Sequence, residues 1–220
     1  MLTIHAAPLV LPVGAVPLPD GAVAVDGGRI AALGPYDEVA AAAPGARVRR
    51  WPGVLTPGLR QWHGLWLLRR CYHPDPREYD ELGELPLWGE RLAALDLTET
   101  RWSGSVRRGL QRMLSHGTTA LASPGARFTD PLVARAVARS GLRVVPVTGA
   151  PGGMLLGDHP DLDPFSEGFD LAGTVHGPLE VGARADLAVF DAEDEAILAA
   201  KGASTCVATV IEGRLLYRSR

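Results

Sequence analysis

The chain has 220 residues, a formal net charge of −3 and a hydrophobic fraction of 46%. This length can bury one core, or one core with a smaller companion domain, and it falls short of the about 250 residues of a closed eight-stranded β/α barrel. The charge gives no basis for binding nucleic acid or an anionic membrane, and because no membrane-spanning or signal-peptide pattern occurs, we expect a soluble cytoplasmic protein.

The N-terminal quarter is predicted to form short strands separated by turns. Asp26-Gly27-Gly28 is predicted to be a hairpin turn, because glycine adopts the positive φ of a tight connection without strain. These strands are too few to bury an apolar face alone, so they need partners from elsewhere in the chain. The predicted strands cover residues 9–13, 22–25, 29–33 and 47–51.

Further along, helices are predicted to alternate with apolar strands, which is the pattern of βαβ units. The first helix has Asp96 and Glu99 as a candidate capping box, and an apolar stripe at helical spacing. The second has Asp130 as its N-cap, Pro131 in its first turn and Gly141 just beyond its end. Strands are predicted at 118–122 and 142–147, and the stripe consists of Trp102, Val106, Leu110 and Met113.

Residues 150–176 are rich in Gly, Pro and Asp, and the chain then returns to a β-rich pattern. Gly149–Gly153 could offer backbone amides to an anion, but no helix pattern follows, so a plain loop is the better interpretation. Glu212-Gly213 is predicted to be a second hairpin turn. The C-terminal strands are expected at 185–190, 206–212 and 214–217.

Three segments resemble signatures of the amidohydrolase superfamily, in particular its imidazolonepropionase-like and deaminase branch. They are Val25–Gly34, Val54–Leu59 followed by His63, and Leu179–Asp191. The resemblance implies an α/β fold in two parts. Residues 1–56 and 174–220 would form a composite β-sandwich from both termini, and residues 57–173 a reduced, open remnant of a β/α (TIM-like) barrel.

The resemblance also implies a divalent metal that activates water for attack on a carbon bearing a leaving nitrogen. The family's first two ligands are histidines separated by one residue; this chain keeps the first as His63 and has Leu65 in place of the second. Leucine cannot bind a metal, and the strands that carry the other ligands have no counterpart. Three or four ligands must converge on zinc, so His63 alone makes no site.

Other residues could in principle complete a site. His116 is a candidate, although its place just before a strand favours a residue at a helix C-terminus. Asp158 and His159 begin an acidic cluster that ends at Asp163, whose alternating oxygens suggest a cation loop but whose spacing does not match an EF-hand; a solvated loop is the simpler interpretation. His73 and Asp161 complete the set.

Two further features could carry function. Cys71 is a candidate nucleophile, but no base stands at a recognisable spacing, and neither it nor Cys206 has metal or disulfide spacing. Tryptophans are concentrated in the barrel-derived part, where they would fill the core or form an interface that covers an open barrel side. These tryptophans are Trp62, Trp66, Trp88 and Trp102.

The family activity would be metal-dependent hydrolysis of carbon-nitrogen, non-peptide bonds. Because Leu65 replaces a ligand and barrel strands are missing, we expect a catalytically degenerate protein with a binding, scaffolding or regulatory role and no cofactor. Its expected partners are a second copy, a full-length relative or a small molecule. The alternative is an active hydrolase or deaminase with zinc or iron in a site rebuilt around His63. A solely structural module would lack a ligand-sized pocket.

Overall fold

The structure, a computed structural model, describes residues 2–146, 161–166 and 169–219. The chain divides into two compact units. The first comprises Met1–Arg60, Leu114–Ala120 and Asp163–Arg220, and the second comprises Gln61–Met113 and Leu121–Leu162. We describe each unit by itself; the domain boundaries expected after residues 56 and 173 stay predictions.

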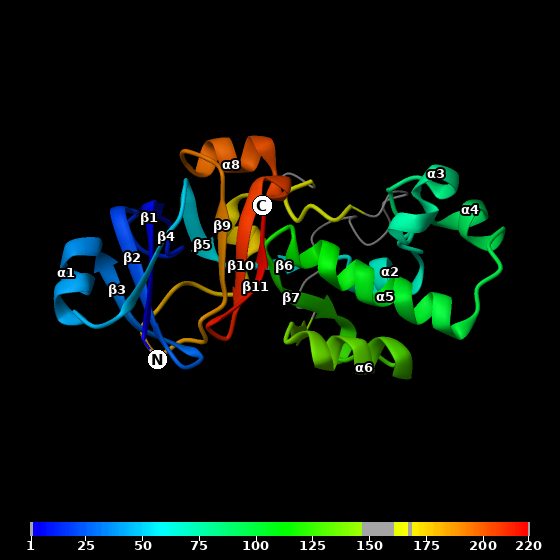
Figure 1. Cartoon of the computed structure of the whole chain (residues 1–220), viewed down its shortest axis with the longest axis horizontal. Helices are drawn as coiled ribbons and strands as arrows, with labels where there is room; N and C mark the ends of the chain where they lie inside the picture. The colour runs from blue at the N-terminus through cyan, green and yellow to red at the C-terminus, as the bar shows by residue number, and fades with distance from the viewer. Residues whose placement is uncertain (1, 147–160, 167–168, 220) are drawn as a thin grey trace. The chain divides into compact units, whose positions relative to one another are not determined.

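The first unit is built on one mixed sheet that takes strands from both ends of the chain (Figure 1). The strand order is β11-β10-β9-β5-β1-β2-β3, and β4 also pairs with β1. β5 and β9 join the N-terminal and C-terminal strands, since Val54 lies opposite Phe190 and Pro57 opposite Leu187. The strands are β1 (Thr3–Val10), β2 (Leu18–Asp26), β3 (Arg29–Pro35), β4 (Arg47–Arg50), β5 (Val54–Pro57), β9 (Leu187–Phe190), β10 (Cys206–Ile211) and β11 (Arg214–Arg218).

Both predicted hairpin turns are present. β2 and β3 are connected through Gly27 and Gly28, and Gly27 has a φ of 57°. β10 and β11 are connected through Glu212 and Gly213, whose φ values are 51° and 73°. Positive φ at both central residues, as at Glu212 and Gly213, is the geometry of a type I′ turn, whose twist matches that of the flanking strands.

β1 begins earlier than the sequence pattern predicted, at Thr3 instead of Leu9. Its first half pairs with β4, and Leu9 and Val10 pair with β5. Pro8 lies where β1 changes partner, a position at which its missing N–H leaves no ladder hydrogen bond unmade. The prediction for residues 9–13 was therefore wrong in its bounds, because β1 is set by pairing with β2 from Thr3 to Val10 and with the more distant β4 and β5.

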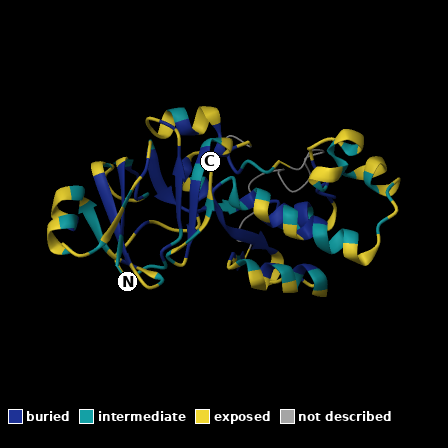
Figure 2. Ribbon diagram, viewed as in Figure 1, coloured by how far each residue is buried: buried dark blue, intermediate teal, exposed yellow. Residues whose placement is uncertain are grey.

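The core of this unit lies on both sides of the sheet (Figure 2). One cluster includes Leu55, Val189 and Val210, and another forms around Ile4 and Val39. Three helices complete the unit: α1 (Tyr36–Ala42), α7 (Leu171–Thr174) and α8 (Glu195–Lys201). The chain is thus a mixed α/β protein, as predicted; the two-layered sandwich stays a prediction.

The second unit is mainly helical, and part of a three-stranded sheet of order β6-β7-β8 belongs to it. None of the described helices is long and apolar enough to cross a membrane. The strands are β6 (Leu59–Gln61), β7 (Thr118–Ser123) and β8 (Arg143–Pro146), and the helices are α2 (Gly64–Arg69), α3 (Tyr79–Leu82), α4 (Gly89–Ala93), α5 (Glu99–Leu114) and α6 (Pro131–Ser140).

The two long helices match their predictions except at one cap. α6 begins as expected, because the Asp130 carboxylate accepts from the backbone N–H groups of Leu132 and Val133. α5 buries Val106, Leu110 and Met113 of the predicted stripe and partly buries Trp102, but Asp96 is not its cap. Thr98 Oγ1 accepts from the N–H of Arg101 at 3.2 Å, and Asp96 instead offers its backbone carbonyl to the Arg101 side chain.

Candidate functional site

His63 lies two residues after the end of β6 and directly precedes the first residue of α2. Its backbone N–H donates to Gln61 Oε1 at 2.9 Å. The Gln61 amide in turn donates to the carbonyl oxygens of Asp161 and Leu162, at 3.3 and 2.9 Å. The buried Gln61 side chain therefore holds the turn that contains His63, and it links this turn to residues 161 and 162.

Glycine allows a close approach just beyond this turn, where α2 packs on β7. A Cβ at Gly64 would lie 3.3 Å from Cβ of Leu121 and 3.1 Å from its Cδ2. The close approach leaves the first turn of α2 against the buried strand, with His63 only 8% exposed.

A cavity of about 420 Å³ opens beside His63. It lies within the second unit and is formed by the start of α2, its last turn and the end of β7. Its described lining residues are mostly apolar or aromatic, and their polar side-chain groups are two guanidinium groups, one imidazole and the indole N–H groups of two tryptophans. The described lining residues are Trp62, His63, Leu65, Trp66, Arg69, Arg70, Ala122 and Pro124.

These walls do not fit the divalent metal that the family's chemistry implies. Leu65, at the position of the second histidine, lines the same cavity as His63 and offers no donor. No carboxylate or thiol is present among the described lining residues. Within the three described ranges, no group of three or more His, Cys, Asp or Glu side chains could hold a metal ion.

The other metal candidates have partners of their own or lie outside the described residues. His116 belongs to the first unit, where its Nδ1 lies 3.4 Å from Ser115 Oγ. Asp163 uses its carboxylate to accept from the backbone N–H groups of Phe165 and Ala203. Asp158 and His159 lie outside the described residues, as does the loop Gly149–Gly153.

Cys71 and His73 are buried in surroundings that do not favour a reactive form of either side chain. Burial raises the pKa of the Cys71 thiol to about 12, so it holds little thiolate at neutral pH. His73 is fully buried; its Nε2 lies 3.0 Å from the carbonyl oxygen of Leu67, which makes Nε2 the donor. Burial lowers the pKa of His73 to about 4. The hydrogen bond to Leu67 opposes this shift by raising the pKa, whereas the positive charges of Arg112 and Arg108 lower it further.

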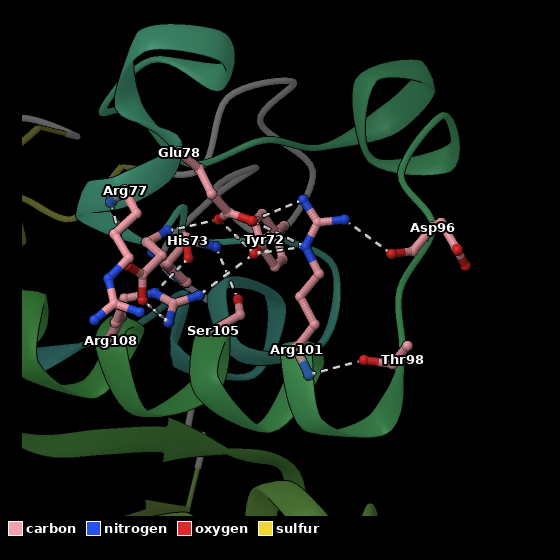
Figure 3. A network of polar contacts seen from close by, with 10 residues as sticks. Tyr72, His73, Arg77, Glu78, Asp96, Thr98, Arg101, Ser105 and Arg108 are labelled. Carbon is pink, nitrogen blue, oxygen red and sulfur yellow. Dashed lines mark hydrogen bonds and ion pairs between the residues drawn. The ribbon is translucent and has the colours of Figure 1, made fainter.

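A polar network surrounds Tyr72 and His73 where the loop before α3 packs on α5 (Figure 3). Tyr72 donates to Glu78 at 2.6 Å, and Arg101 pairs with the same carboxylate at 2.8 Å. Arg108 donates to the carbonyl oxygen of His73 and pairs with Asp75. These hydrogen bonds and ion pairs hold residues 72–78 against α5, and among the described residues His73 Nδ1 is the one polar side-chain atom of Tyr72 and His73 left without a hydrogen-bond partner.

The arginines of the cavity were not identified as site residues from the sequence. Arg69 and Arg70 end an apolar run, where basic residues commonly stabilise a helix C-terminus. The available signal was their spacing from Trp66, because residues three and four apart share one face of a helix. Only the packing of α2 beside β7 places that face on a cavity.

Residues 21–46 match the family model of the imidazolonepropionase-like composite domain of bacteria. This match confirms the resemblance to amidohydrolase-type composite domains that the sequence signatures predicted. No curated protein matches the chain.

Solved structures that resemble the chain are hydrolases and deaminases. The A. niger ochratoxinase is 24% identical, with a TM-score of 0.43 over 66% of this chain and 30% of its own. The guanine deaminase of Bradyrhizobium japonicum is 21% identical, with a TM-score of 0.41 over 66% and 34%. The Xanthomonas campestris adenosine deaminase with bound zinc is 20% identical, with a TM-score of 0.39 over 64% and 32%. The chain thus spans about a third of the length of these structures.

Proposed function

We propose that this chain is a catalytically degenerate amidohydrolase-like protein that binds a small molecule in the cavity beside His63. One observation carries the proposal: Leu65 lines the cavity together with His63, so the lining residues offer one imidazole where a metal needs several ligands. The volume of about 420 Å³ is within the range of small-molecule sites. A small-molecule binding role needs only the residues that line the cavity, and it requires no further metal-ligating side chain.

In this proposal the composite sheet is retained as a scaffold and the second unit is the reduced, open remnant of a β/α barrel. The two-layered sandwich of the family would correspond to the mixed sheet that joins both ends of the chain. A homodimer that covers the open side of the remnant is part of the same proposal. The mass of the protein in solution tests that part separately.

The main test is the metal content of the purified full chain, compared with that of His63→Ala and of His116→Ala. We expect zinc and iron well below one equivalent per chain in all three proteins, because a lone histidine binds either metal weakly. Stoichiometric zinc or iron that His63→Ala abolishes and His116→Ala leaves unchanged would overturn the proposal. That result would establish instead an active hydrolase with a site rebuilt around His63.

A further inference from the structure

The described wall of the cavity beside His63 carries positive charge. Arg69 and Arg70 are exposed at the end of α2 and line the cavity. Ion pairs of the second unit use other arginines, Arg101 with Glu78 and Arg108 with Asp75, and none among the described residues involves Arg69 or Arg70. The described lining residues include no carboxylate, so the two guanidinium groups give this wall the charge that suits an anion.

The same wall carries an aromatic ring. Trp66 is half-buried and lies three and four residues before the two arginines, so the indole and the guanidinium groups share one side of α2. Trp62, which is buried, lines the same cavity, and Ala122 in β7 and Pro124 just after β7 add apolar surface. Indole rings bind flat aromatic groups by offset or edge-to-face stacking.

From these two features we propose that the cavity binds a planar aromatic carboxylate, with its ring against Trp66 and its carboxylate on Arg69 and Arg70. The inference rests on the proposed binding function and names its ligand class. Arginine suits this role because its planar, permanently charged fork matches a carboxylate in two parallel hydrogen bonds. The apolar remainder of the wall excludes water from the ring and disfavours small polar anions.

The test is isothermal titration of the purified full chain with naphthoate and with the uncharged naphthamide of the same substitution pattern. The two probes have the same ring and nearly the same size, so they differ in charge at the group that the arginines would hold. We expect naphthoate to bind about tenfold more tightly than naphthamide, because charge-assisted hydrogen bonds are about twice as strong as neutral ones. Equal affinity for the two probes, or binding of neither, would overturn the inference.

Variants assign the binding to the cavity. We expect Arg69→Gln and Arg70→Gln each to weaken naphthoate about threefold, the range of a partly solvated ion pair, and to leave naphthamide unchanged. Trp66→Leu should weaken both probes by a similar factor through lost stacking. Arg135→Gln, an exposed arginine of α6 outside the cavity, is the matched control and should change neither. Naphthoate binding that all three cavity variants leave intact would overturn the assignment.

Failure of this inference is distinguishable from failure of the proposed function. A chain with little metal that ignores both probes keeps its degenerate, binding role and loses only the aromatic carboxylate. A chain with stoichiometric metal that depends on His63 loses both, because the cavity would then serve catalysis.

Discussion

The backbone N–H of Gly58 donates a hydrogen bond to the carbonyl oxygen of Asp186 at 3.0 Å. Gly58 belongs to the Pro57-Gly58-Leu59 signature and Asp186 to the signature near the C-terminus, so this bond joins the two motifs that predicted the family. The next residue, Leu59, donates to the carbonyl oxygen of Gly117 at 2.9 Å. Both signatures therefore have a structural role in the first unit, and a chain could keep them after losing catalysis.

Replacing Gly58 with alanine should destabilise the first unit. An added Cβ would collide with the side chain of Thr119 on the adjacent buried strand. Overpacking of this kind costs about 1 to 3 kcal/mol in the free energy of unfolding, which urea titration followed by circular dichroism would measure. Gly45→Ala is the control, because an added Cβ there meets nothing within 4 Å. An unchanged urea midpoint for Gly58→Ala would show that the strand shifts to make room.

Arg108 should contribute more to stability than its neighbour Arg107. Arg108 Nε donates to the carbonyl oxygen of His73 at 2.8 Å and Nη1 pairs with Asp75 at 3.0 Å, whereas Arg107 is exposed. We expect Arg108→Gln to cost about 1 to 2 kcal/mol, because it removes a charged donor from a partly buried carbonyl. Arg107→Gln should be within about 0.5 kcal/mol of the parent protein.

Hydrogen exchange would locate the effect of Arg108→Gln. The amides of residues 72–78 should exchange faster in this variant, because the loop loses its attachment to α5. Equal stability losses for the two arginine variants, without faster exchange in that loop, would contradict the prediction.

Both cysteines should resist thiol reagents in the native protein. Burial raises the pKa of Cys71 to about 12 and that of Cys206 to about 11. The thiolate is the reactive form and both side chains are buried, so labelling by iodoacetamide at neutral pH should be slow until denaturant is added. Mass spectrometry of the labelled peptides checks each site. Rapid labelling of Cys71 in the native protein would contradict this prediction and would support the hypothesis that Cys71 is a nucleophile.

Local chemistry was predictable from the sequence, and long-range pairing was not. The turn at Glu212-Gly213 and the caps of α6 depend on residues next to one another, so their patterns were sufficient. β1 was misplaced because its partners β4 and β5 are distant in sequence. The cap of α5 was misassigned because Asp96 and Thr98 are both good acceptors two residues apart.

The residues of the candidate site were likewise only partly predictable from the sequence. His63 and Leu65 were found through a motif, and the structure places both on one cavity. Arg69 and Arg70 were missed, since nothing in their own segment says that β7 lies opposite. Site residues supplied by the packing of two elements are visible only once the fold is known.

Two buried histidines should make the protein sensitive to acid. Burial lowers the pKa of His5 to about 4, helped by the nearby charge of Arg49, and lowers the pKa of His73 to about 4. His5 Nδ1 accepts from Trp51 Nε1 at 3.1 Å, an interaction that the neutral ring makes at that nitrogen. Both histidines thus favour the neutral form in the folded state.

The sign of the pH dependence follows from proton uptake. Between pH 6.5 and about 4 the unfolded chain binds a proton at each histidine and the folded chain does not, so stability is full above pH 6.5 and falls as the pH is lowered. Each histidine accounts for up to about 3 kcal/mol over this window. Urea unfolding from pH 7 to pH 4 measures the loss. His5→Gln and His73→Gln should each reduce the slope while lowering stability at pH 7. A parent protein whose stability is flat across this window would show that the two rings titrate alike in the folded and unfolded chain.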